Sequence, residues 1–141
     1  MRALYFDCKA GISGDMVVGA LLDLGISREY LINELRKLSL PNFRIAVKTV
    51  FKKGIKAKKF DVITKKETVH RHLKDINGII DGSSLSEDVK NLSKNIFLEL
   101  AKAEANVHKT TIGEVHFHEV GAIDSIIDIV SAAILIKKLN I

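Results

Sequence analysis

The sequence lacks several features that mark particular classes of protein, such as disulfide-rich, secreted or membrane proteins. Its single cysteine, Cys8, excludes a disulfide framework and any zinc site built from paired cysteines, and it fits a reducing compartment. Tryptophan is absent, and no run near the N-terminus has the apolar core of a signal peptide. The most apolar stretch, residues 120–136, carries two aspartates and is too short to span a membrane. We therefore expect a soluble, cytoplasmic protein without membrane contact.

The proportions of hydrophobic and charged residues are those of an ordinary folded domain. Its 141 residues are 47% hydrophobic and 28% charged, which is typical of a folded rather than a disordered protein. A chain of this length buries about two thirds of the surface of its unfolded state. We expect residues 1–141 to form a single domain with one core.

The net charge of +5 comes from one segment. Between Arg44 and Lys66 there are nine basic residues and a single acid, Asp61, while the rest of the chain is slightly acidic. Such a patch suits a polyanion or a phosphorylated ligand. Lysines on a short antiparallel strand also protect an exposed edge from aggregation, and we favour this solvated-edge interpretation.

The first half of the chain predicts a strand, two helices and a hairpin. Residues 4–6 are apolar and aromatic, as in a short buried strand. A glycine-containing turn leads from them into the first helix, which Gly25 ends, and Ser27 caps the second. Residues 43–63 predict two strands joined at a lysine-glycine turn.

The second half predicts helices. Ser86, followed by two acids, is a typical helix start. The apolar stripe predicted along this long helix consists of Val89, Leu92, Ile96, Leu100, Ala103 and Val107. Residues 122–139 are apolar almost all round, so we expect a central buried helix there. The expected fold is a two-layer α+β domain, with short strands and a Lys-rich β-hairpin packed against about five helices.

The glycine turn is the first candidate site. Its glycines allow backbone N–H groups to converge on a ligand, and a helix N-terminus favours an anion such as phosphate. Flanking aspartates suit a cation or a substrate hydroxyl, although a tight turn with Asp15 capping the helix is an equal alternative. The spacing matches neither a Walker loop nor a dinucleotide-binding fingerprint. The candidate phosphate- or substrate-binding residues are Asp7, Gly11, Ser13, Gly14 and Asp15.

The histidines are the second candidate site, because four of the five form two His-x-His pairs. In an extended chain the side chains at i and i+2 share a face, so each pair offers two ligands to one ion. Imidazole with carboxylate suits Ni, Zn, Co or Fe better than Mg or Ca. The alternative is histidines at the surface or bonded to the backbone. The candidate ligands are His70, His72, His116, His118 and Glu119.

Asp124 and Asp128 add a further candidate, because carboxylates on an apolar helix are costly unless they are paired or metal-bound. Their i, i+4 spacing places both on one face, where they suit a shared cation or the orientation of a histidine ligand. The alternative is that this face is the solvent side of the helix. We expect Cys8 to be a small buried hydrophobic residue rather than a ligand, and His108 to lie at the surface.

Taken in order, these motifs resemble the LarC-type nickel insertion proteins over nearly the whole chain. The most specific block is His-Phe-His-Glu-Val-Gly-Ala at residues 116–122. The resemblance is carried by residues 6–8, 11–16, 19–25, 70–76 and 115–128.

The resemblance implies a nickel chelatase that makes the nickel pincer nucleotide of lactate racemase-type enzymes. Members insert Ni(II) into a pyridinium bisthiocarboxylic acid mononucleotide, forming nickel–sulfur bonds and a nickel–carbon bond, with CTP and Mg or Mn. It further implies that a C-terminal domain, absent from this chain, binds CTP and makes oligomer contacts. We therefore expect an N-terminal fragment without full activity, whose partners are the nucleotide-like substrate, that domain and further copies in an oligomer.

Two other functions stay open. A non-catalytic nickel-binding module would bind the metal without turnover, and the residues alone also allow zinc or cobalt. A nucleic-acid-binding domain would use the basic segment, which offers only Phe51 and Phe60 for base stacking. We consider the nucleic acid the less favoured partner.

Overall fold

Two helices and a hairpin form the N-terminal half of the fold. The computed structural model of the chain describes residues 2–9, 11–41, 43–65, 71–117 and 120–141. Its first elements are α1 (Gly14–Asp23), α2 (Arg28–Leu35), β1 (Phe43–Lys52) and β2 (Ile55–Thr64). The strands pair antiparallel along their whole length, and Lys53 and Gly54 form the two-residue turn with φ of 49° and 80°. The predicted hairpin and its turn are confirmed.

The C-terminal half is helical, with one very short sheet. Its elements are β3 (Arg71–His72), α3 (Leu73–Asp81), α4 (Glu87–His108), the 3-10 turn η1 (Ile112–Glu114), β4 (His116–Phe117) and α5 (Ile123–Lys138). Strands β3 and β4 pair antiparallel. The described residues therefore form five α-helices and two antiparallel two-stranded sheets, which confirms the α+β class.

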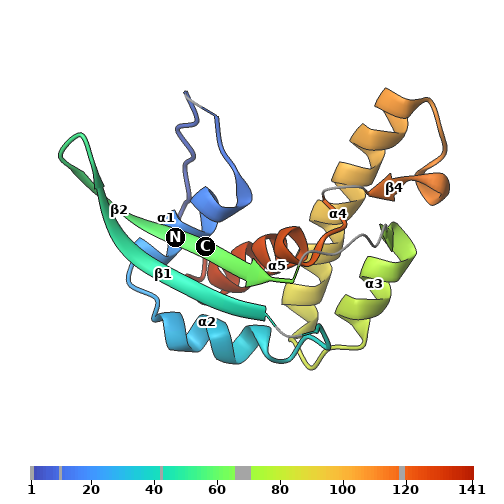
Figure 1. The fold of residues 1–141 in the computed structure, drawn as a ribbon. Coiled ribbons are helices and arrows are strands. Elements are labelled where there is room, and N and C mark those ends of the chain that lie inside the picture. The colour runs from blue at the N-terminus through green and yellow to red at the C-terminus, as the bar shows by residue number, and fades with distance from the viewer. Residues whose placement is uncertain (1, 10, 42, 66–70, 118–119) are drawn as a thin grey trace.

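Helix α5 lies at the centre of the molecule. It contacts α1, α2, α4 and β2, and Figure 1 shows it between the hairpin layer and the α3–α4 pair. Ile126, Ile127 and Ile134 are each at most 1% exposed, so the predicted central helix is confirmed. Helix α1 lies directly on β2, because a Cβ at Gly19 would be 2.4 Å from the carbonyl oxygen of Lys58.

The strand predicted at residues 4–6 is wrong. This segment has no regular structure, and Tyr5 is 87% exposed. A strand needs a partner edge, but each described strand pairs within its own two-stranded sheet, while the Arg2 guanidinium donates to the carbonyl of Leu139 at the end of α5. The expected burial of Cys8 is also wrong, because this residue is exposed.

The predicted stripe on α4 is displaced by about one position. The residues that are buried on α4 are Val89, Ser93, Phe97, Ala101 and Ala105. Of the predicted stripe, only Val89 is among them, and Val107 is 73% exposed. Helix α4 packs against both α3 and α5. Periodicity alone does not distinguish between two adjacent faces that both carry apolar residues.

None of the helices in the described part of the chain is both long enough and apolar enough to cross a membrane.

Candidate functional site

One histidine of each His-x-His motif lies in the sheet of β3 and β4. His72 pairs with His116 across the two strands, and their ring centroids lie 3.9 Å apart with the rings tilted by 47°. The extended backbone that a ligand pair requires is therefore present at both residues. The remaining candidates, His70, His118 and Glu119, lie outside the described residues.

A backbone carbonyl faces one ring nitrogen of His72. Nδ1 of His72 lies 3.1 Å from the carbonyl oxygen of Val115. A carbonyl oxygen only accepts hydrogen bonds, so in the tautomer that makes this contact a hydrogen bond Nδ1–H donates and Nε2 is the nitrogen left for a metal. The backbone N–H of His72 donates to Oδ2 of Asp75 at 2.8 Å, which fixes the main chain as well. Metal-binding histidines are commonly held in this way, by a hydrogen bond from the nitrogen that does not bind the metal.

The β3–β4 sheet is attached firmly to the core. Phe117 is 1% exposed and packs edge-to-face on Phe97 of α4 at 6.2 Å, whereas His116, one residue earlier, is exposed. The Arg71 guanidinium donates to the carbonyl of Gly121 at 2.7 Å. A Cβ at Gly121 would be 2.6 Å from the carbonyl oxygen of Phe117, so the chain requires glycine at this approach. The histidine pair is thereby held next to the start of α5.

The turn that leads into β4 is held by Glu114. Its carboxylate accepts hydrogen bonds from the hydroxyls of Thr110 and Thr111, at 3.0 and 2.9 Å, and from the N–H of Thr111. These hydrogen bonds hold the pKa of Glu114 below its usual value. The hydrogen bonds to the Glu114 carboxylate therefore hold the backbone turn that leads into His116.

Four aspartates line a second feature, an acidic pocket of about 210 Å³. Asp15 comes from α1, Asp61 from β2, and Asp124 and Asp128 from α5. Helix α1 and α5 are in contact here, because a Cβ at Gly14 would be 2.6 Å from Oδ2 of Asp128. Asp61 was not among the predicted site residues, although it is the one acid of the basic segment, a signal that could have identified it.

The charges of the acidic pocket favour a cation. Burial first, and then the charges of Asp15 and Asp124, raise the pKa of Asp128 to about 7. Lys59 pairs with Asp61 at 2.7 Å, and the hydroxyl of Ser13 donates to Asp15. A phosphate would add negative charge to this pocket, whereas a cation would relieve the repulsion among its carboxylates. Of the two ligands suggested for the glycine turn, the electrostatics therefore favour the cation.

The structure separates the residues predicted around the glycine turn. Asp7 is exposed, and neither Asp7 nor Gly11 lines the acidic pocket. The N–H of Gly11 donates to the carbonyl of Cys8 at 2.9 Å, closing a turn in which Gly11 has a φ of 86°. Ser13, not Asp15, occupies the N-cap position of α1. Of the predicted motif, only Asp15 lines the pocket, while Ser13 donates to Asp15 and Gly14 lies against Asp128.

The described residues do not form a complete metal coordination shell. Within them, no group of three or more His, Cys, Asp or Glu side chains is arranged to hold a metal ion. His108 is exposed and pairs with Glu104 at 3.3 Å, so its expected place at the surface is confirmed. A metal held by His72 and His116 must take further ligands from the residues not described or from a bound molecule.

Comparison with known proteins connects these features to one family. The sequence profile of the family described as nickel insertion protein matches residues 4–141. A protein of Acetivibrio thermocellus named pyridinium-3,5-bisthiocarboxylic acid mononucleotide nickel insertion protein is 52% identical over all of this chain. Proteins of the same name from Geobacillus kaustophilus and Staphylococcus epidermidis are 48% and 47% identical, over 100% and 99% of the chain. No solved structure matches the chain.

These relatives are much longer than the chain, which spans 35–37% of their length. The match nevertheless runs through both His-x-His motifs, the glycine turn and α5, which together form the two candidate sites. This chain belongs to the nickel insertion protein family.

Proposed function

We propose that this chain is the N-terminal, nickel-handling part of a protein that inserts nickel into pyridinium-3,5-bisthiocarboxylic acid mononucleotide. The observation that carries the proposal is the His72–His116 pair, which brings two separate histidine motifs to one place in the fold. Relatives of 47–52% identity bear the name of this activity. The product would be the nickel pincer nucleotide used by lactate racemase-type enzymes.

The histidine pair would hold the incoming nickel ion. Nδ1 of His72 faces the carbonyl of Val115, so we assign Nε2 to the metal, and the ring of His116 lies beside that of His72 to share the ion. His70, His118 and Glu119 are the further ligands we propose, since each adjoins this pair in sequence. Imidazole binds Ni(II) well, and a site without thiolates gives the ion up more readily to the sulfur atoms of the substrate.

The acidic pocket between α1, β2 and α5 would contribute to nickel insertion by binding a cation and by accepting a proton. Asp124 and Asp128 are the oxygen donors that we assign to a divalent cation in this pocket, beside Asp15 of α1. Ser13 adjoins the pocket through its hydrogen bond to Asp15, and Gly14 through its close approach to Asp128. Formation of the nickel–carbon bond releases a proton from the substrate ring. Without a cation in the pocket, the pKa of Asp128 is about 7, which suits the acceptance of this proton near neutral pH, so Asp128 would serve as this base only while it does not bind the cation.

We assign CTP, its Mg or Mn ion and the oligomer contacts to the C-terminal portion found in the relatives. Carboxylate oxygens are the donors that Mg and Mn prefer, so the acidic pocket has the right chemistry for such an ion. The described residues provide no group of three ligands for it, however, which is why we place it with the rest of the protein. When bound, CTP and the ion would supply the energy and charge neutralisation for insertion.

Calorimetric titration of Ni(II) tests the proposal. The purified chain and a His108→Ala control should both bind nickel stoichiometrically, because His108 lies at the end of α4 and pairs with Glu104. A His72→Ala/His116→Ala variant should bind at least tenfold more weakly. Equal affinity in all three proteins would refute the assignment of the site.

Insertion itself requires a second assay. The chain is combined with the C-terminal portion of the Acetivibrio thermocellus relative, the mononucleotide, Ni(II), CTP and Mg(II), and the product is followed by mass spectrometry. Formation of the nickel pincer nucleotide supports the proposed function. Nickel binding without any product would instead identify a non-catalytic nickel-binding module.

A further inference from the structure

Strand β1 has one edge without a hydrogen-bonding partner. The hairpin closes through a two-residue turn, so Lys52 and Ile55 form a hydrogen-bonded pair, and such pairs recur at every second residue. The residues of β1 whose N–H and C=O groups point away from β2 are therefore Phe43, Ile45, Val47, Thr49 and Phe51. Within the described part of the chain, no group forms a hydrogen bond with these backbone groups.

The opposite edge of the hairpin is covered. Lys58 of β2 belongs to the set that points away from β1, and a Cβ at Gly19 of α1 would clash with its carbonyl oxygen. Helix α1 therefore lies against the β2 edge, in agreement with the alternation deduced from the turn. The β1 edge lacks such a cover, because among the described elements only β2 makes extensive contact with β1. An uncovered edge of this kind accepts a further strand.

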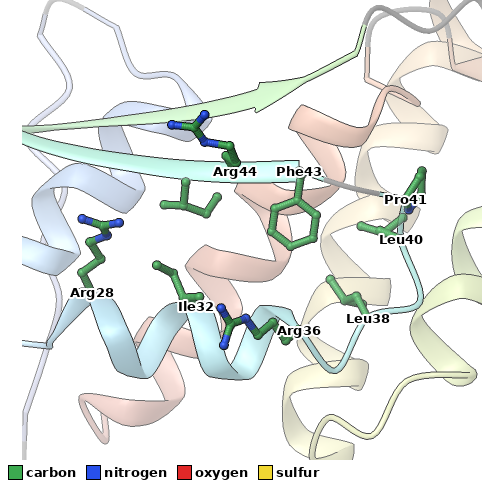
Figure 2. Close-up of a pocket in the computed structure, with 9 residues that line it drawn as sticks. Arg28, Ile32, Arg36, Leu38, Leu40, Pro41, Phe43 and Arg44 are labelled. Atoms are coloured by element: carbon green, nitrogen blue, oxygen red, sulfur yellow. The ribbon is translucent and has the colours of Figure 1, made fainter.

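A hollow of about 430 Å³ lies beside this edge, between β1 and α2. Figure 2 shows the side chain of Phe43 on the α2 side of β1 and that of Arg44 on the opposite side. The apolar residues that line the hollow are Ile32, Leu38, Leu40, Pro41, Phe43 and Ile45. A strand added to β1 would extend the sheet over this hollow, so its inward side chains would enter an apolar space.

The two faces of an added strand would meet different surroundings. Side chains alternate along a strand, so those on one face would lie beside Phe43 and Ile45, and those on the other beside the bases of β1. These bases are Arg44, Lys48 and Lys52. Within the described residues, no acid pairs with any of the three. The complementary strand is therefore one in which apolar and acidic residues alternate.

A second copy of β1 does not meet this requirement. Two β1 strands paired edge to edge would place six bases on one face of the new sheet, and like charges on neighbouring strands destabilise the pairing. The bases thus oppose self-association through this edge, which is the protection expected of lysines on an exposed strand. The same bases attract an acidic strand, so repulsion and attraction together define the partner.

We infer that the β1 edge binds an extended acidic segment of a partner protein by strand addition. The main-chain hydrogen bonds supply affinity, and the alternating acidic and apolar side chains of the segment supply specificity. No residue of the β1 edge lines the acidic pocket or belongs to the histidine pair, so the inference does not depend on the proposed function.

Amide hydrogen exchange with a synthetic peptide tests the inference. The probe is a nine-residue peptide of alternating glutamate and valine, added to the ¹⁵N-labelled chain. The N–H groups of Ile45, Val47 and Thr49 should exchange at least tenfold more slowly with the peptide, because they gain partners. A peptide of alternating lysine and valine should have no effect. Equal protection by both peptides, or none by the acidic one, would overturn the inference.

Three variants locate the binding. Thr49→Pro removes an N–H that is not bonded to β2, a change that edge strands tolerate, and should weaken peptide binding at least tenfold. Arg44→Ser/Lys48→Ser should weaken it equally through lost charge. Lys9→Ser/Lys74→Ser removes two exposed charges outside the hairpin and should keep the affinity within twofold. Binding that ignores Thr49→Pro, or that falls equally in both double variants, would refute strand addition.

Two other occupants of the edge are tested in the same way. If the chain alone sediments as a dimer in which the amides of Ile45 and Val47 are protected, a second copy occupies the edge and the inference fails. If the C-terminal portion of the Acetivibrio thermocellus relative protects these amides, the edge belongs to the rest of the same protein, and the inference fails as well. A monomer whose edge amides are protected by the acidic peptide alone is the expected result.

Discussion

The imidazole rings of His72 and His116 lie 3.9 Å apart, although helices α3 and α4 separate the two residues along the chain. The pair therefore exists only when α3 and α4 have folded back and β4 has reached β3. A metal that binds such a pair favours the folded state over the unfolded chain, since the unfolded chain has no preformed site. On the proposed function, nickel binding and folding are therefore linked.

Nickel should stabilise the folded chain. At a free concentration 100 times the dissociation constant, Ni(II) should raise the free energy of unfolding by about 2.7 kcal/mol. The His72→Ala/His116→Ala variant should lose this gain, and His108→Ala should keep it. Thermal unfolding with and without nickel measures the effect. A gain of equal size in the double variant would show that the metal binds elsewhere.

A methyl group at Gly121 should disturb the histidine pair without touching it. In Gly121→Ala the new Cβ would be 2.6 Å from the carbonyl of Phe117, so the turn that Arg71 holds must shift. We expect a loss of about 1–3 kcal/mol in the free energy of unfolding, typical of overpacking, together with weaker nickel binding. Denaturation in urea and calorimetry measure the two effects.

Gly78→Ala is the matched control for this substitution. Gly78 lies in α3, and a Cβ there would have nothing within 4 Å. Alanine in a helix interior is favoured over glycine by about 0.5–1 kcal/mol, so this variant should be slightly more stable and should bind nickel normally. If both alanine variants behaved alike, the close approach of Gly121 to Phe117 would not matter.

Asp128 should make the chain less stable as the pH rises. Its pKa is about 7 in the folded protein, above the ordinary 3.8, so between these values the folded state holds a proton that the unfolded state has lost. The free energy of unfolding therefore falls from about pH 4 to pH 7 through this group. Asp128→Asn should remove that slope and be more stable at pH 8, by about 1–2 kcal/mol after screening by solvent is allowed for.

Urea denaturation between pH 4 and 8 measures this dependence. Asp23→Asn, an exposed aspartate at the end of α1, is the control and should follow the pH profile of the unmodified chain. A divalent cation in the acidic pocket should reduce the slope of the unmodified chain, because a nearby positive charge lowers the pKa of Asp128. A profile of Asp128→Asn identical to that of Asp23→Asn would contradict the account of this pocket.

Much of the fold was predictable from local patterns. Ser27 accepts the N–H of Tyr30 at 3.1 Å, and Gly25 has a φ of 103°, so the predicted cap and stop are both confirmed. The wrong predictions concern tertiary contacts between elements that are distant in the sequence. The sequence at residues 4–6 resembles a buried strand, but a strand also requires a partner edge, and local pattern does not supply that information. The face of α4 was misplaced for a similar reason, because its neighbours decide which apolar residues are buried.

The residue types of the candidate site were predictable from the sequence, but which of these residues meet in the fold was not. Spacing alone identified His72 and His116 as possible ligands, and only the register of β3 against β4 shows that they meet. Asp61 and Arg44 lie in one basic segment, but Asp61 lines the acidic pocket and Arg44 lines a separate hollow between α2 and β1. A count of charges does not separate them, because neighbouring strand residues face different surroundings.

The central claim is that the histidine motifs hold the nickel ion. X-ray absorption at the nickel edge of the one-to-one complex tests it directly, because imidazole rings give a characteristic scattering pattern. We predict at least two imidazole ligands in the unmodified chain and fewer in His72→Ala/His116→Ala, with no change in His108→Ala. A nickel shell made only of oxygen atoms in the unmodified chain would contradict the account and move the metal to the acidic pocket.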